Sequence, residues 1–133
     1  MKYLHVLNQA LLDIFENDPD VILIGEDLLD PYGGAFKVTS GLSTRFPNRV
    51  LATPLSEQAI TGIAGGMALR GLKPIVEIMF GDFLTLGMDQ ILNHITKYHS
   101  MYGGEVSAPV IIRTPMGGGR GYGPTHSQSI EKY

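Results

Sequence analysis

Three short, largely apolar runs restrict the folds open to this chain more than any other feature. They lie at residues 21–24, 74–80 and 109–113, and each gap between them is long enough to hold a helix. Runs that are apolar at nearly every position are typical of parallel strands buried on both faces. Strands that alternate with helices in this way predict an α/β fold with a mainly parallel sheet.

Helical periodicity fills the segments before and between these runs. Apolar side chains recur there at helical spacing, which is typical of amphipathic helices. The predicted helices cover residues 3–17, 38–46, 56–69 and 84–98, and a further short strand is predicted at residues 49–52. In the third helix, Gly62, Gly65 and Gly66 each cost roughly 1 kcal/mol of intrinsic stability. That cost indicates close approach of the helix backbone to the sheet or to another helix.

Composition excludes several classes of function. The chain has 133 residues, which suits one domain, and no cysteine, which excludes disulfides, thiol catalysis and thiolate metal sites. A net charge of −3 gives no reason to expect nucleic acid as a partner, and no apolar run approaches the length of a membrane span. The first residues resemble neither a signal peptide nor a transit peptide, so a cytoplasmic protein is expected.

Two carboxylates stand at positions where a structural role competes with a functional one. Glu57 follows Ser56, a good N-cap residue, and lies in the first turn of the predicted helix over residues 56–69. An acid there complements the helix dipole for about half a kcal/mol, or it contacts a ligand. Glu26 follows the apolar run at residues 21–24, at the strand end where ligands of open α/β sheets gather. Its site and loop roles are equally supported.

A glycine-rich loop at residues 116–126 follows the last apolar run. It is not a Walker loop, because no Gly-Lys-Ser/Thr follows, and neither a Gly-x-Gly-x-x-Gly pattern nor a following helix supports a phosphate site. A flexible or ligand-shaped loop is therefore favoured over a phosphate cradle. His126 lies in this loop beside Ser127, and spacing alone favours a structural role over a catalytic one.

The remaining titratable residues do not form a recognisable metal site. His94 and His99 lie five residues apart on a predicted helix, which turns them about 140° away from each other. No histidine pair has the spacing of a zinc site, so no metal held by side chains of this chain is expected. Glu77 is an acid inside an apolar strand, and a structural role is favoured, either buried and paired or at a solvated edge.

Five motifs, in order along the chain, carry a family resemblance. They are Gly25-Glu26-Asp27, Tyr32-Gly33-Gly34-Ala35-Phe36-Lys37-Val38, Thr53-Pro54-Leu55-Ser56-Glu57, Gly71-Leu72-Lys73-Pro74-Ile75-Val76-Glu77 and His126-Ser127-Gln128-Ser129. The chain resembles the pyrimidine-binding domain of the β subunit (E1 component) of thiamine-diphosphate-dependent 2-oxoacid dehydrogenases. The pyruvate, branched-chain 2-oxoacid and acetoin enzymes share the pattern, so the resemblance does not identify the 2-oxoacid.

The resemblance implies a three-layer thiamine-diphosphate-binding fold of the transketolase pyrimidine-domain type, with a mainly parallel sheet. Residues 1–133 would form one pyrimidine-binding domain. In the family the β subunits continue through a further strand and a separate C-terminal domain, so this sequence is expected to be truncated near the C-terminal end of the fold.

The resemblance also implies roles for particular side chains. Glu57 matches the acid that hydrogen-bonds the N1′ atom of the cofactor's aminopyrimidine and activates it. Glu26 resembles a second acid that relays protons, and His126 resembles the active-site histidine that faces the thiazolium and the substrate. An aromatic ring at Phe83 would stack on the aminopyrimidine. The apolar walls of the cofactor site would then be completed by Leu55 and Met79.

The family's cofactor site is shared between two subunits. A Gly-Asp-Gly motif with a later Asn, on the α subunit, holds the diphosphate and Mg²⁺, and here Gly81-Asp82-Phe83 lacks the second glycine. The chain is therefore expected to supply half of a site, in a homo- or hetero-oligomer with an E1 α-type subunit, and to pass an acyl group to a lipoyl-bearing E2 component. Two alternatives are a non-catalytic module that self-associates through its glycine-containing helix face and a split transketolase-like enzyme.

Overall fold

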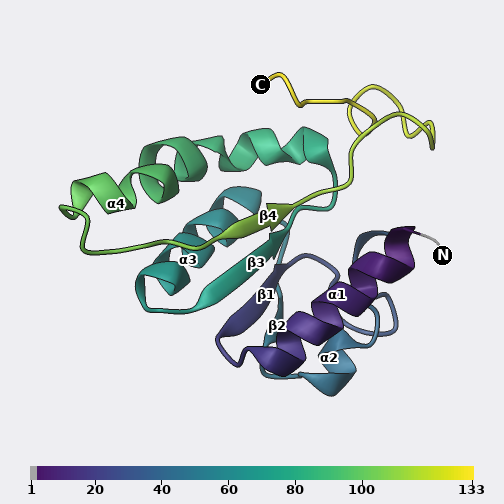
Figure 1. Ribbon diagram of the computed structural model, residues 1–133. Helices are drawn as coiled ribbons and strands as arrows, with labels where there is room; N and C mark the ends of the chain where they lie inside the picture. The colour runs from purple at the N-terminus through teal and green to yellow at the C-terminus, as the bar shows by residue number, and fades with distance from the viewer. Residues whose placement is uncertain (1–2) are drawn as a thin grey trace.

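The computed structural model describes residues 3–133 and arranges them in three layers, with a sheet between two groups of helices (Figure 1). The elements are α1 (Tyr3–Asn17), β1 (Val21–Gly25), η1 (Ala35–Lys37), α2 (Leu42–Arg45), β2 (Val50–Ala52), α3 (Glu57–Leu69), β3 (Lys73–Glu77), η2 (Gly81–Gly87), η3 (Gln90–His94), η4 (Ile95–Lys97), α4 (Tyr98–Met101) and β4 (Ile111–Arg113). No helix among these residues is long and apolar enough to cross a membrane.

The sheet has four parallel strands in the order β2-β1-β3-β4. The central pair runs from Val21 opposite Lys73 to Gly25 opposite Glu77. In Figure 1, α1 and α2 lie on one side of this sheet, and α3 and the helical stretch that ends in α4 lie on the other. The predicted α/β fold with a mainly parallel sheet is confirmed.

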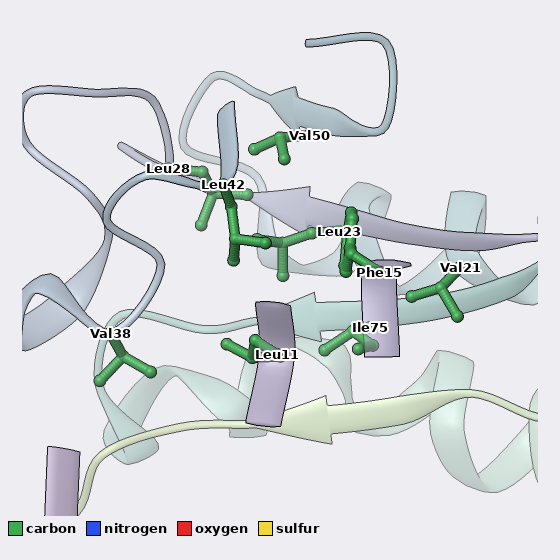
Figure 2. Packing of buried hydrophobic residues seen from close by; sticks show 9 residues of the cluster. All are labelled: Leu11, Phe15, Val21, Leu23, Leu28, Val38, Leu42, Val50 and Ile75. Carbon is green, nitrogen blue, oxygen red and sulfur yellow. The ribbon is translucent and has the colours of Figure 1, made fainter. Parts of the chain in front are cut away.

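The two faces of the sheet bury separate apolar clusters. Figure 2 shows the cluster on the α1 side, which contains Leu11, Phe15, Val21, Leu23, Leu28, Val38, Leu42, Val50 and Ile75. The cluster on the α3 side contains Ile24, Ile60, Ala64, Val76 and Ile78. Neighbouring strand residues such as Leu23 and Ile24 therefore face opposite clusters. Burial on both faces explains why the strand segments are apolar at successive positions.

The glycines of α3 allow neighbouring side chains to approach its backbone closely. A Cβ atom added at Gly65 would lie 3.0 Å from Ile95 Cγ1, and one at Gly62 would lie 3.2 Å from Gln90 Oε1. The close approach predicted for these two glycines is confirmed. Gly66 has no neighbour within 4 Å, so packing does not explain this third glycine.

The single regular helix predicted over residues 84–98 is wrong. From Gly81 to Met101 the chain changes from a 3₁₀ helix to a π turn at Gln90–His94, a second 3₁₀ turn and a last α turn. The contacts of Gln90 and Ile95 with two glycines of α3 fall within this stretch. We attribute the irregular winding to these contacts, because tertiary packing overrides a local helical pattern.

The bounds of two further elements, and the cap of a third, differ from the prediction. The strand predicted over residues 74–80 ends at Glu77, where its last pair with β4 forms, and the helix predicted over residues 38–46 contracts to α2. Ser56 does not cap α3 through its side chain. The backbone N–H of Ser56 instead donates a hydrogen bond to Glu26 Oε1 over 3.2 Å. This bond links the start of α3 to the residue that follows β1.

Asp30 organises the loop that joins β1 to α2. Its Oδ1 atom accepts a hydrogen bond from Gly41 N at 2.8 Å, and its Oδ2 atom accepts hydrogen bonds from the hydroxyls of Ser43 and Thr44 at 2.8 and 2.7 Å. The hydrogen bond from Gly41 N and those from the Thr44 and Ser43 hydroxyls lower the pKa of Asp30 to about 2.

We expect Asp30→Asn to destabilise the fold by roughly 1 kcal/mol at neutral pH, because solvent screens this partly exposed carboxylate. The folded-state pKa of about 2 lies below the unfolded value of about 3.9. The stabilisation is therefore present above about pH 4 and is lost as the pH falls towards 2. Urea unfolding of both proteins between pH 6 and 2 tests this, and a difference that persists undiminished at the lowest pH would contradict it.

Candidate functional site

Two acids meet where the first strand ends and α3 begins. Glu26 follows β1 and is only 3% exposed, and the hydrogen bond from Ser56 N holds it against the first turn of α3. Burial raises the pKa of Glu26, and repulsion from Glu57 and Asp27 adds to this, while the Ser56 N–H opposes it. Glu26 therefore keeps its proton to a higher pH than an ordinary glutamate, beside the half-buried carboxylate of Glu57.

The first turn of α3 also supports the segment that carries the predicted aromatic residue. Thr61 Oγ1 donates a hydrogen bond to the carbonyl oxygen of Glu57 over 2.7 Å. A Cβ atom added at Gly87, the last residue of η2, would lie 2.8 Å from that Thr61 hydroxyl. This close approach requires a glycine at residue 87, and it lets η2 pack directly on the helical turn that positions Glu57. Phe83 is part of η2 and is therefore held near that turn.

An aromatic cluster joins η2 to the C-terminal loop. The imidazole of His126 lies with its centroid 5.0 Å from the rings of both Phe80 and Phe83, nearly perpendicular to each. Phe80 also packs edge to face with Tyr122 at 5.7 Å. Edge-to-face pairs at these distances are favourable. The structure thus brings two predicted site residues, Phe83 and His126, into direct contact.

Hydrogen bonds hold the C-terminal loop in this place. Buried Asp82 accepts, at its Oδ1 atom, hydrogen bonds from Gln128 Nε2 at 2.8 Å and from Gln128 N at 3.3 Å. Gly81 N donates to the carbonyl oxygen of Pro115 over 2.9 Å. A Cβ atom at Gly81 would overlap the Met116 side chain, so a larger residue there would displace Met116 from this contact. Figure 1 shows the loop, in yellow, beyond the carboxyl end of β4.

Buried Glu77 fixes the opposite loop, which follows β1. Its Oε1 atom accepts a hydrogen bond from Ala35 N at 2.9 Å, and its Oε2 atom pairs with the guanidinium of Arg113 on β4. A Cβ atom added at Gly34 would lie 2.8 Å from Glu77 Oε1. Burial raises the pKa of Glu77, and Arg113 and the Ala35 N–H offset part of that rise. The structural role predicted for Glu77, in its buried and paired form, is confirmed.

Two adjoining pockets lie between the loop after β1 and the C-terminal loop. Both are lined by Phe36, Phe80, Arg120 and Tyr122, and His126 lines the first. Met79, predicted as an apolar wall of the cofactor site, lines the second pocket. Leu55, predicted as the other apolar wall, is 80% exposed and lines neither of these two pockets.

Sequence reasoning missed the residues that line both pockets. Phe36 lies within one of the family motifs, and Arg120 and Tyr122 lie within the glycine-rich loop, but no spacing pattern connects these segments. No group of three or more His, Asp or Glu side chains between residues 3 and 133 is arranged to hold a metal ion. His94 approaches Asp89 at 3.8 Å, and His99 contacts the carbonyl oxygen of Val106.

Comparison with proteins of known sequence identifies close relatives over the whole chain. The chain is 44% identical to a chloroplastic pyruvate dehydrogenase E1 component subunit beta-4 of rice and to a pyruvate dehydrogenase E1 component subunit beta of Leifsonia xyli, over 96% of its length in both cases. It is also 44% identical, over its full length, to a 3-methyl-2-oxobutanoate dehydrogenase subunit beta of Mycobacterium tuberculosis. The chain spans 32% to 38% of the length of these relatives.

A solved structure and a family comparison place the fold. A split-gene transketolase, described as an inactive β4 tetramer, aligns with a TM-score of 0.65 over 92% of this chain and 35% of that chain. Its sequence identity is 23%, so this likeness shows the fold alone. The family described as "Transketolase, pyrimidine binding domain" matches residues 1–133. The chain therefore belongs to the family of transketolase pyrimidine-binding domains.

Proposed function

We propose that this chain is the pyrimidine-binding half-site of a thiamine-diphosphate-dependent 2-oxoacid dehydrogenase, within an E1 β subunit. The observation that carries the proposal is the pair of acids, buried Glu26 beside half-buried Glu57, at the start of α3. The identity to β subunits of pyruvate and 3-methyl-2-oxobutanoate dehydrogenases supports it. The reaction is the oxidative decarboxylation of a 2-oxoacid, with transfer of the acyl group to a lipoyl-bearing E2 component.

The side chains present fit the aminopyrimidine end of thiamine diphosphate. A basic ring nitrogen requires a carboxyl partner, which Glu57 offers, and a flat heteroaromatic ring requires an aromatic surface, which Phe83 offers. For the diphosphate and its Mg²⁺, the described residues 3–133 contain no group of acids and histidines able to hold the metal ion. We therefore assign those groups to an E1 α-type partner.

The chain's own residues then have distinct tasks. When bound, the cofactor supplies a carbon nucleophile for the carbonyl carbon of the 2-oxoacid. Glu57 holds a proton at the pyrimidine nitrogen, and Glu26, whose pKa is raised chiefly by burial, relays protons to it. His126 contacts Thr125 Oγ1 through Nδ1 over 2.9 Å, which leaves its Nε2 atom for the substrate. Phe80 and Phe83 pack against that imidazole and hold it in place.

Calorimetric titration with thiamine diphosphate and Mg²⁺ tests the proposal. We expect saturable binding only when an E1 α subunit of the pyruvate or 3-methyl-2-oxobutanoate type is present, because this chain supplies the pyrimidine end alone. In the presence of that partner, Phe83→Ala should weaken binding about tenfold, since stacking on an aromatic ring contributes roughly 1 kcal/mol or more.

A matched control replaces a ring outside the site. Tyr102 is half-exposed at the end of α4, so Tyr102→Ala should leave the affinity unchanged. Absence of binding with every partner would favour the non-catalytic, self-associating module. Binding accompanied by turnover of a ketose phosphate in place of a 2-oxoacid would favour the split transketolase-like enzyme.

A further inference from the structure

The two adjoining pockets contain an unpaired cation that the proposed function does not use. The guanidinium of Arg120 lies over the ring of Phe36, 4.3 Å from its centroid, and donates a hydrogen bond to the Tyr122 hydroxyl over 3.3 Å. None of the ion pairs formed within residues 3–133 includes Arg120. We propose that Arg120 and the surrounding rings form a capture subsite for a small carboxylate that bears an apolar group.

The ring beneath Arg120 is held in a costly backbone conformation. Phe36 has φ of 58°, in the left-handed region that a bulky residue rarely adopts, and Lys37 beside it has φ of 61°. Such conformations persist only where the surroundings impose them, and they concentrate at binding sites. Here the hydrogen bond from Ala35 N to buried Glu77 anchors the preceding residue. The fold thus maintains strain that places the Phe36 ring in both pockets.

The other ionisable groups of the proposed site are mainly acids, so the positive charge of Arg120 is the feature that attracts an anionic substrate. Glu26 and Glu57 are acids of the proposed site, and Asp82 is a buried acid beside the ring cluster. A 2-oxoacid is an anion, and each of these acids repels it when ionised. The other guanidinium near the site, on Arg113, is already paired with Glu77. Lys37, beside Phe36, donates a hydrogen bond to the Pro31 carbonyl oxygen and lines neither pocket, whereas Arg120 lines both. A cation at the mouth of a cleft raises the local concentration of anions.

The dimensions of the pockets define the class of ligand. The second pocket has a cavity volume of about 100 Å³ and is lined by Met79 and by the rings of Tyr32, Phe36, Phe80 and Tyr122. An apolar cavity of about 150 Å³ admits benzene, so this cavity suits an alkyl chain of a few carbons. A guanidinium stacked on one ring still presents N–H donors at its edge for a carboxylate oxygen.

The position of Arg120 at an exposed loop indicates capture of the substrate before the reaction. A decarboxylation gains nothing from a salt bridge that stabilises the carboxylate in the ground state, because only interactions that strengthen in the transition state accelerate the step. Exposed Arg120 therefore acts on the entry of the substrate. The choice of a 2-oxoacid as the ligand rests on the proposed function, whereas binding of an apolar carboxylate does not.

The test is a ¹H–¹⁵N NMR titration of the 133-residue chain without cofactor or partner. We expect 3-methyl-2-oxobutanoate to shift the amide resonances of Phe36, Arg120 and Tyr122 to saturation. Acetate, which lacks the alkyl group, and 3-methyl-2-butanone, which lacks the carboxylate, should each bind about tenfold more weakly or not at all. Binding should also weaken as salt is added, because the cation is exposed.

Substitutions locate the subsite. Arg120→Gln should weaken binding of 3-methyl-2-oxobutanoate about tenfold, whereas Arg70→Gln, at an exposed arginine beyond α3, should leave the affinity within about twofold. Arg120 is exposed and belongs to neither buried cluster, and the dispersion of the amide spectrum shows whether each variant is folded. Equal affinity of Arg120→Gln and the parent chain, or equal binding of the neutral ketone, overturns the proposal.

The outcome is separable from that of the proposed function. If the carboxylate binds at Arg120 but thiamine diphosphate never binds with an α-type partner, the subsite stands and the assignment as an E1 half-site falls. If the cofactor binds and the carboxylate does not, the subsite alone is refuted. In an assembled enzyme that turns over, Arg120→Gln should raise KM about tenfold and leave kcat unchanged, as expected of uniform binding.

Discussion

Replacing Glu57 by alanine is expected to abolish C2–H exchange of thiamine diphosphate in the assembled enzyme, with a rate loss of at least about 100-fold. The carboxyl group at the start of α3 is the acid of this chain that we assign to the pyrimidine nitrogen, and alanine can neither donate nor accept a proton there. Proton exchange at C2, followed by NMR after transfer to deuterated water, measures the step directly and needs no 2-oxoacid.

Two controls separate this chemical role from a structural one. Glu57→Gln keeps the shape of the side chain and its hydrogen-bonding capacity but removes the ionisable group, so exchange should be lost to a similar extent. Glu105→Ala removes an exposed carboxylate from the loop after α4 and should leave exchange unchanged. The fold should tolerate Glu57→Ala, because the helix dipole accounts for only about half a kcal/mol. Normal exchange in Glu57→Ala would remove the assignment.

The second large effect concerns Glu77. We expect Glu77→Ala to lower the free energy of unfolding by about 3 kcal/mol, because it leaves the Arg113 guanidinium without its buried partner. This loss of unfolding free energy lies at the lower end of the range for breaking a buried ion pair. The reason is that the Arg113 side chain is 20% exposed and can gain hydration, whereas Glu77 is fully buried. Urea unfolding at pH 7 measures the change. The amide of Ala35, which loses its acceptor, should exchange faster with solvent.

Companion variants identify the uncompensated charge as the cause. The double variant Glu77→Leu with Arg113→Met should recover much of the lost stability, since apolar pairs often replace buried ion pairs without cost. Glu16→Ala breaks a pair with Arg45 at the surface and should cost less than about 1 kcal/mol. If Glu77→Ala costs no more than Glu16→Ala, the buried pair does not support the fold as we describe.

The strands and the longest helices were predictable because their patterns are local. Val21–Gly25 and Tyr3–Asn17 lie close to where continuous burial and helical periodicity place them. The stretch from Gly81 to Met101 was not predictable in detail, although its apolar residues recur with a helical period. Its winding depends on contacts with glycines of α3, some thirty residues earlier in the chain. Hydrophobic periodicity reports only on residues close in sequence, so it cannot predict such contacts.

In the candidate site, too, residues within local patterns were predictable and contacts between distant segments were not. Glu26 and Glu57 were identified because each lies at the end or start of a predictable element, and the structure brings them together. The contact between Phe83 and His126 also joins two predicted residues. The stacking of Arg120 on Phe36 was not predictable, because the two residues lie more than eighty positions apart in the sequence. It also depends on a left-handed backbone conformation at Phe36, which phenylalanine rarely adopts.

The contact between Asp82 and Gln128 joins the C-terminal loop to η2. One carboxylate oxygen receives both the backbone and the side-chain N–H of Gln128, and His126 lies only two residues away. The Asp82 carboxylate therefore ties Gln128 to η2, the element that carries Phe83, alongside the hydrogen bond from Gly81 N to the Pro115 carbonyl oxygen. Because the imidazole of His126 lies against the ring of Phe83, any shift of this loop relative to η2 changes the surroundings of both site residues together.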